Sequence, residues 1–267
     1  MDMKNKHILL VAGNSIAIIA TIIVNALAVI LPLNGKTTQE LSDNIPNLFV
    51  PAGITFSIWS IIYFFLIVFM IYQIMGLIKK QQSDMTYLEK IGGWFMLASL
   101  ANVIWIFLWH YEYVYFSLLA MLVLLISLIM IYHLRLNIGL SAAPLREKLA
   151  VHVTISIYLG WISVATIANV TAVLVTADVR ELFLGQVTWT ILVIAVVTIL
   201  TILILLRRKD IAYGLVIVWA LLGIIIKRLG DDPIYGVQTN VAIAAAVAIL
   251  VIIGTMLVKT VPTVYKK

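Results

Sequence analysis

Long apolar segments, separated by short polar ones, dominate the sequence. A helix needs about 20 apolar residues to cross a bilayer core roughly 30 Å thick. Segments of about this length occupy residues 8–32, 50–78, 91–110, 113–134, 149–176, 184–206, 211–228 and 238–259. The pattern therefore predicts an all-α integral membrane protein with eight transmembrane helices. The longest polar connection outside the membrane, residues 34–49, is predicted either to cap the bundle or to be an unstructured tether.

The composition agrees with a membrane protein. Hydrophobic residues make up 63% of the chain and charged residues 11%. In soluble domains, roughly 45–50% of the residues are hydrophobic and about 25% are charged. The mean hydropathy is +1.12. So few charges cannot cover a water-facing exterior, and the lipid bilayer is the expected surrounding of most of the surface.

The positive charges predict the orientation in the membrane. Cytoplasmic loops are enriched in Lys and Arg. If the amino terminus is inside and the eight spans alternate, all 18 Lys and Arg lie inside except Lys36, Arg180, Lys227 and Arg228. We therefore expect both termini to be cytoplasmic, with the plasma membrane as the location.

The same charges exclude several function classes. The net charge of +6 does not indicate a nucleic-acid partner, because the basic residues lie at the ends of spans. The chain has no cysteine, which excludes disulfides and a thiol nucleophile. No ionisable Asp, Glu, Lys or Arg lies near the middle of a span, which argues against a proton-coupled pump. The four His are far apart, no catalytic or metal site is predicted, and no cofactor is required.

Aromatic and amide side chains are the remaining chemistry within the spans. With a rise of about 1.5 Å per residue, Trp59, Asn102 and Asn169 lie roughly 10–13 Å below the outer ends of their helices. Helical spacing places further aromatics on the same faces. The predicted ligand-binding residues are Phe56, Trp59, Tyr63, Asn102, Trp105, Trp109, Tyr158, Trp161 and Asn169. The alternative is structural: amides in hydrocarbon also bridge helices, and Trp also serves as packing bulk.

Three motifs of this set resemble one family, the tryptophan-rich sensory protein/translocator protein (TspO/MBR) family. They are Pro51-Ala-Gly-Ile-Thr-Phe56-Ser-Ile-Trp59-Ser-Ile-Ile-Tyr63 in the second span, Asn102-Val-Ile-Trp105 in the third and Tyr158-Leu-Gly-Trp161-Ile-Ser-Val-Ala165-Thr-Ile-Ala-Asn169 in the fifth. Two features differ from the family's pattern. Ile157 replaces a proline, and the loop 34–49 has no Trp.

The resemblance implies a five-helix bundle that binds tetrapyrroles such as protoporphyrin, or other flat apolar ligands, between these aromatic residues. Porphyrin breakdown in light and sterol transport are attributed to members of that family. The resemblance covers about residues 1–176, so we predict a TspO/MBR-like bundle in this region. Residues 177–267 are expected to add three transmembrane helices and a cytoplasmic tail.

The leading hypothesis is a membrane sensor or receptor that binds such a ligand in the outer half of the bilayer. The alternatives are a permease for an uncharged or lipid-like solute, a porphyrin-degrading enzyme, for which the sequence offers no acid–base pair, and a structural partner of another membrane complex. The expected partners are the lipid bilayer and an apolar small molecule. The last three spans are expected either to pack as a helical lid against the five-span bundle or to form a homodimer interface.

Overall fold

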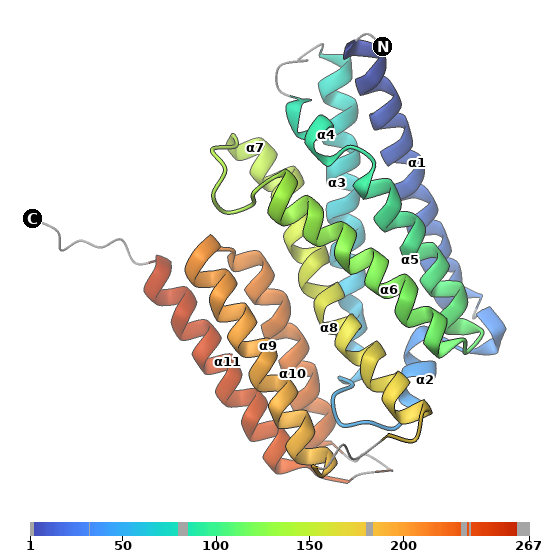
Figure 1. Cartoon of the computed structure of the whole chain (residues 1–267), viewed down its shortest axis with the longest axis vertical. Coiled ribbons are helices and arrows are strands. Elements are labelled where there is room, and N and C mark those ends of the chain that lie inside the picture. The colour runs from blue at the N-terminus through green and yellow to red at the C-terminus, as the bar shows by residue number, and fades with distance from the viewer. Residues whose placement is uncertain are drawn as a thin grey trace, which may run out of the picture.

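The computed structural model describes residues 3–31, 33–79, 85–179, 184–230, 234 and 236–260. Within these ranges the chain is helical and contains no β-strand (Figure 1). The long helices are α1 (Met3–Ile30), α3 (Ile58–Ile78), α5 (Trp94–His110), α6 (Val114–Ile129), α8 (Val153–Thr176), α9 (Gln186–Arg208), α10 (Ile211–Leu229) and α11 (Thr239–Thr260). Each predicted span forms one of them, which confirms the all-α membrane architecture. Arg180 and the predicted tail 261–267 lie outside the described residues.

The third predicted span is shorter than expected. Seven helices of the described chain are long and apolar enough to cross a membrane, whereas α5 has 17 residues. The sequence predicted a span from residue 91, but Gly92 has a φ of +53° and ends the short helix α4 (Thr86–Ile91). A positive φ is readily adopted only by glycine, so the chain changes direction there before α5 begins.

The short elements connect the long helices. They are η1 (Leu33–Gly35), α2 (Thr38–Asp43), the 3₁₀ turn η2 (Gly53–Ser57), α7 (Leu145–Glu147), and two π-helical turns, η4 (Met130–Arg135) and η5 (Lys148–His152).

The connection from α1 to α3 is a folded segment and not an unstructured tether. Thr37 caps α2: its hydroxyl accepts from the N–H of Glu40, and its own N–H donates to the Glu40 carboxylate at 2.6 Å. These hydrogen bonds hold the pKa of Glu40 below its ordinary value, so the cap is intact at neutral pH.

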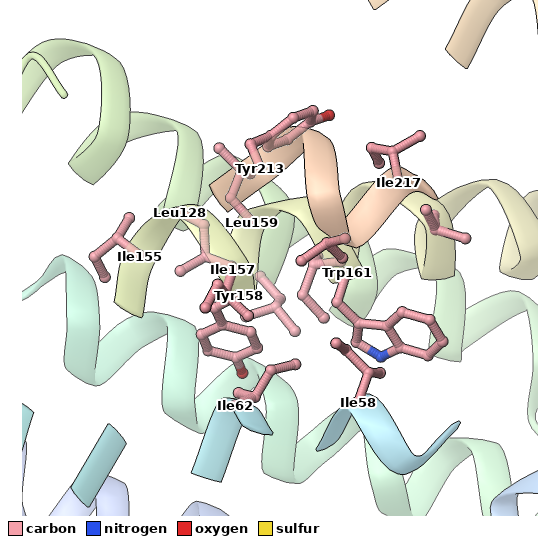
Figure 2. Close-up of a cluster of buried hydrophobic side chains, with 14 of the residues drawn as sticks. Ile58, Ile62, Leu128, Ile155, Ile157, Tyr158, Leu159, Trp161, Tyr213 and Ile217 are labelled. Atoms are coloured by element: carbon pink, nitrogen blue, oxygen red, sulfur yellow. The ribbon is translucent and has the colours of Figure 1, made fainter. Parts of the chain in front are cut away.

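Helix α8 joins the amino-terminal bundle to the last three helices. It packs against α3 and α6 on one side and α10 on the other, and α9 and α11 lie against each other beyond α10 (Figure 1). Figure 2 shows this buried region: Leu159 of α8 lies beside Tyr213 of α10, whereas Trp161 extends from α8 toward Ile58 of α3. A Cβ at Gly160 would lie 3.1 Å from Val216 Cβ, so the missing side chain permits this close approach.

A polar cluster fastens α9 to the chain between α6 and α8. The Arg208 guanidinium donates to Asn137 Oδ1 at 2.8 Å and to the carbonyl of Ile138 at 2.9 Å. Next to it, the Ser156 hydroxyl donates to Asp210 at 2.6 Å. Arg208 and Asp210 are buried, and buried charges of this kind need such partners. The predicted regions 1–176 and 177–267 are thus joined by packing and by hydrogen bonds.

Candidate functional site

Trp59 lies at the centre of an aromatic cluster at the α2 end of the bundle. Its ring stacks on Tyr63, with centroids 5.7 Å apart and 24° between the planes. The ring of Trp161, from α8, meets it edge to face at 6.4 Å. Phe56 contacts Trp161 in the same way at 5.9 Å. Both geometries are favoured by the quadrupole of aromatic rings, so α3 and α8 present one continuous aromatic wall.

A second aromatic pair comes from α5. Trp105 and Trp109 are stacked with centroids 6.0 Å apart. The indole N–H of Trp105 donates to Asn169 Oδ1 at 3.2 Å, and Asn169 Nδ2 donates to the hydroxyl of Ser117 at 3.1 Å. Asn169 therefore bridges α5, α6 and α8 and fixes the plane of Trp105. Both the oxygen and the nitrogen of its side-chain amide are therefore hydrogen-bonded within the protein.

Two hollows lie on either side of Phe56 and Trp59. The smaller, between α3, α5 and α8, is lined by Phe56, Trp59, Trp105, Trp109, Trp161 and Asn169 together with α2, and has about 40 Å³ of free volume. The larger has about 470 Å³, lies between α1 and α3, and is lined by Phe56, Trp59, Tyr63 and Asn25 together with residues of α2. Small-molecule sites usually measure roughly 300–1,000 Å³. Only the larger of these two hollows reaches that size.

The remaining two predicted residues lie behind this wall. Asn102 is fully buried and accepts a hydrogen bond from Asn25 Nδ2 at 2.7 Å. The ring of Tyr158 meets Trp59 edge to face at 6.2 Å. The Trp161 indole N–H is buried and has no hydrogen-bond partner in the described part of the chain, whereas Asn102 and the Tyr158 hydroxyl lie close enough to interact with each other. Buried polar groups in native proteins are nearly always hydrogen-bonded, so an unpaired one is a candidate partner for a water or a ligand.

Sequence reasoning did not include Asn25 or the residues of α2 among the predicted ligand-binding residues. Asn25 lines the larger cavity together with Thr37, Thr38, Gln39, Ser57 and Ser60. The Thr37–Glu40 capping box was the signal that could have indicated α2, because this spacing is typical of helix starts.

Helix α2 lies over the aromatic cluster and is fastened on two sides. The Trp109 indole N–H donates to the carbonyl of Thr38 at 3.4 Å, and the Thr38 hydroxyl lies 3.4 Å from His110 Nε2. At its other end Asp43 forms an ion pair with Lys227 of α10. Helix α2, which is part of the polar connection 34–49, therefore covers this end of the aromatic cluster.

Helix α10 holds the start of α3 in place. The indole N–H of Trp219 donates to the carbonyl of Thr55 at 3.0 Å, and the N–H of Ala52 donates to the carbonyl of Gly223 at 2.9 Å. A Cβ at Gly223 would lie 1.9 Å from Thr55 Oγ1. Because Phe56 follows Thr55 directly, α10 sets the position of the aromatic wall. No local pattern in the sequence indicates a contact between residues this far apart.

Replacing Asn169 with alanine is expected to lower the free energy of unfolding by about 1–3 kcal/mol, because it leaves the buried indole N–H of Trp105 and the hydroxyl of Ser117 without this partner. Thermal unfolding in detergent measures the effect. Thr171→Val on the same helix is the control, since it removes only a hydrogen bond to the carbonyl of Ile167. Equal stability of the Asn169 variant and the control would contradict a bridging role.

The walls of the two hollows carry neutral side chains. The two hollows are lined by aromatic rings, amides, hydroxyls and aliphatic side chains, which supply stacking faces and neutral hydrogen-bonding groups. Across the described ranges, no three or more His, Asp or Glu come together as metal ligands.

Comparison with known proteins gives one result. No curated protein and no solved structure matches the chain. The model of the TSPO-like protein family matches residues 9–258. The matched range includes the motifs of α3, α5 and α8, and it continues through α9 and α10 into α11, beyond the region that the motifs cover. A match over nearly the whole length shows that this membrane protein belongs to the TSPO-like family.

Proposed function

We propose that the protein is a membrane receptor or sensor that binds a flat apolar ligand, with a tetrapyrrole as the leading class. The observation that carries the proposal is the cavity of about 470 Å³ beside Phe56, Trp59 and Tyr63. Its size suits a small molecule, and the stacked rings of Trp59 and Tyr63 offer a flat surface. The resemblance of the surrounding motifs to the TspO/MBR family favours tetrapyrroles among flat ligands.

The distribution of polar groups around the cavity supports an oriented ligand. Thr37, Thr38 and Gln39 of the α2 segment, which connects the end of α1 to the start of α3, contribute two hydroxyls and an amide to the lining. A tetrapyrrole with carboxylate side chains has one polar edge and an otherwise apolar ring. We propose that the polar edge lies toward α2 and the ring along Trp59.

The cavity also has a side that faces lipid. Val29 and Ile30 of α1 line it and are 59% and 71% exposed. Because exposed aliphatic side chains on a membrane helix contact acyl chains, we propose that the ligand enters from the bilayer between α1 and α3. An apolar ligand is concentrated in that phase.

The proposal is tested by intrinsic Trp fluorescence of the purified full chain with protoporphyrin IX. We expect saturable quenching at micromolar concentrations, because Trp59 lines the cavity. Trp94→Phe, at the other end of α5 from Trp109, should keep the same midpoint. Quenching that rises linearly without saturation would count against the ligand class.

The orientation is a separate part of the proposal. The Lys and Arg distribution favours both termini in the cytoplasm and residues 34–49 outside, and we propose the plasma membrane as the location. The chain has no cysteine, so single cysteines introduced for Lys4 or Lys36 can be labelled selectively. A membrane-impermeant maleimide should label intact cells only at position 36.

A permease is the second candidate, and one feature favours it. His7, Asn14, Thr21 and Asn25 are buried on one face of α1, so polar groups follow the helix from its start to the cavity. The same groups also bridge helices, as in the hydrogen bond from Asn14 Nδ2 to Gln73 Oε1 at 2.8 Å. Solute uptake into liposomes containing the protein, above that of empty liposomes, would favour the permease over the receptor.

A further inference from the structure

A second large cavity lies at the opposite end of α3 from the aromatic cluster. It has a volume of about 380 Å³. Its walls come from the last turns of α3, the start of α4 and the segment that leads into α7, which lie toward the amino-terminal end of the bundle in Figure 1. The lining residues are Tyr72, Met75, Gly76, Lys79, Met85, Tyr87, Pro144 and Arg146. The aromatic site shares none of them.

The cavity contains two positive charges. Lys79 and Arg146 both line it and are exposed. Neither side chain forms an ion pair or a hydrogen bond with any part of the chain that the structure describes. The nearby carboxylate of Glu147 is directed to His152 Nε2 at 3.5 Å. The two charged residues that line the cavity are therefore both positive, and Glu147 is not one of the lining residues.

A buried hydrogen-bond donor lies in the same wall. Tyr87 is 1% exposed, and its hydroxyl has no hydrogen-bond partner among the described residues. Its ring lies 5.5 Å from that of Tyr72. Burial, together with Tyr72 and Glu147, raises the pKa of Tyr87, so the hydroxyl keeps its proton at neutral pH. An acceptor oxygen in the cavity would satisfy this group.

The rest of the cavity is apolar and continues to the lipid-facing surface. Met75 and Met85 contribute their thioether side chains, and Met75 is 44% exposed. The cavity thus combines a cationic, hydrogen-bonding part with an apolar part at the end of a transmembrane helix. A soluble anion would use only the first part, whereas an amphiphile uses both.

We propose that this cavity binds the headgroup of an anionic phospholipid, with its phosphate between Lys79 and Arg146. Arg presents a planar fork of donors to phosphate oxygens, and Lys supplies a compact charge. The Tyr87 hydroxyl donates to a third acceptor oxygen, and the start of the acyl chains lies along Met75 and Met85. Basic pockets between membrane helices recognise anionic headgroups in this way.

Native mass spectrometry of the full chain in neutral detergent tests the proposal, with phosphatidylglycerol as the probe. We expect one tightly bound phosphatidylglycerol, and phosphatidylcholine should bind more weakly because its headgroup has no net charge. The double variant Lys79→Gln/Arg146→Gln should lose about tenfold or more in affinity. Tyr87→Phe should lose severalfold while keeping the ring.

Matched controls separate a site from general attraction to a basic surface. Arg135→Gln and Lys148→Gln remove exposed charges that do not line the cavity, and they should bind as the unmodified protein does. Equal losses in these controls, or equal binding of the two lipids, would overturn the proposal. Glycerol 1-phosphate distinguishes the source of the phosphate: if it competes at concentrations similar to those of the lipid, the assignment to a lipid is wrong.

Discussion

Replacing Trp59 with alanine is expected to weaken protoporphyrin binding by more than about tenfold. Trp59 lines both hollows, as Phe56 and Thr38 do, and its ring stacks on Tyr63. Aromatic stacking contributes about 0.5–1.5 kcal/mol beyond area burial, and lost apolar contact adds about 25 cal/mol per Å². With the lower stacking value, a loss of about 40 Å² of apolar contact already gives roughly 1.5 kcal/mol, which is slightly more than a tenfold change. The measurement is the midpoint of a fluorescence or absorbance titration.

The alanine variant also lowers stability. Deleting a fully buried Trp costs about 3–5 kcal/mol, and we expect less here because Trp59 is half-buried. Trp59→Phe is the milder variant, which keeps a ring and should lose severalfold in affinity. Trp94→Ala is the control for loss of an indole outside the site. If folded Trp59 variants bind protoporphyrin with unchanged affinity, the cavity beside α1 is not the site.

Replacing Gly223 with alanine is expected to destabilise the protein and to weaken ligand binding, although Gly223 lies on α10 and lines neither hollow. The new Cβ would lie 1.9 Å from Thr55 Oγ1 and 2.9 Å from Pro51 Cβ. Thr55 is fully buried and cannot turn away, so α10 and η2 must separate. Overpacking of this kind costs about 1–3 kcal/mol, more than the helix propensity gained on replacing glycine, at most about 1 kcal/mol.

The loss of affinity is the more informative result. Phe56 follows Thr55, so displacement of η2 moves the aromatic wall. Gly254→Ala on α11 is the matched control, because nothing lies within 4 Å of its Cβ position, and it should be neutral or slightly stabilising. Adding Thr55→Ala to Gly223→Ala removes the closest atom and should restore part of both properties. Unchanged binding in a destabilised Gly223 variant would show that α10 does not position the site.

The fold could be predicted to a large extent because the bilayer imposes a simple rule. Backbone groups in lipid must be satisfied within the segment, so long apolar stretches become helices. The sequence therefore located the long helices, including α9 and α11, without any information on packing. It placed the start of the third span too early, because Gly92 and Gly93 are compatible with an apolar segment although Gly92 has a positive φ.

The candidate site could be predicted only in part. Helical spacing put Phe56, Trp59 and Tyr63 on one face, and the structure brings Trp105, Trp109 and Trp161 to the same end of the bundle. Spacing could not tell which partners each amide finds. Asn169 is engaged by Trp105 and Ser117, whereas Asn102 accepts from Asn25 and lies next to Tyr158. Both residues are asparagines within apolar helices, and only their neighbours in the folded structure distinguish them.

The sequence by itself thus determined the membrane environment, the helices and the residue types that can bind a flat ligand, since these depend on hydrophobicity and on spacing within one segment. The tertiary structure decided which hollow has the volume of a small-molecule site. It placed this cavity between α1 and α3, with α2 over the aromatic cluster. It also decided that α10 supports the start of α3 through Trp219 and Gly223. Such contacts join residues far apart in the chain, and they depend on shapes and distances that no local pattern contains.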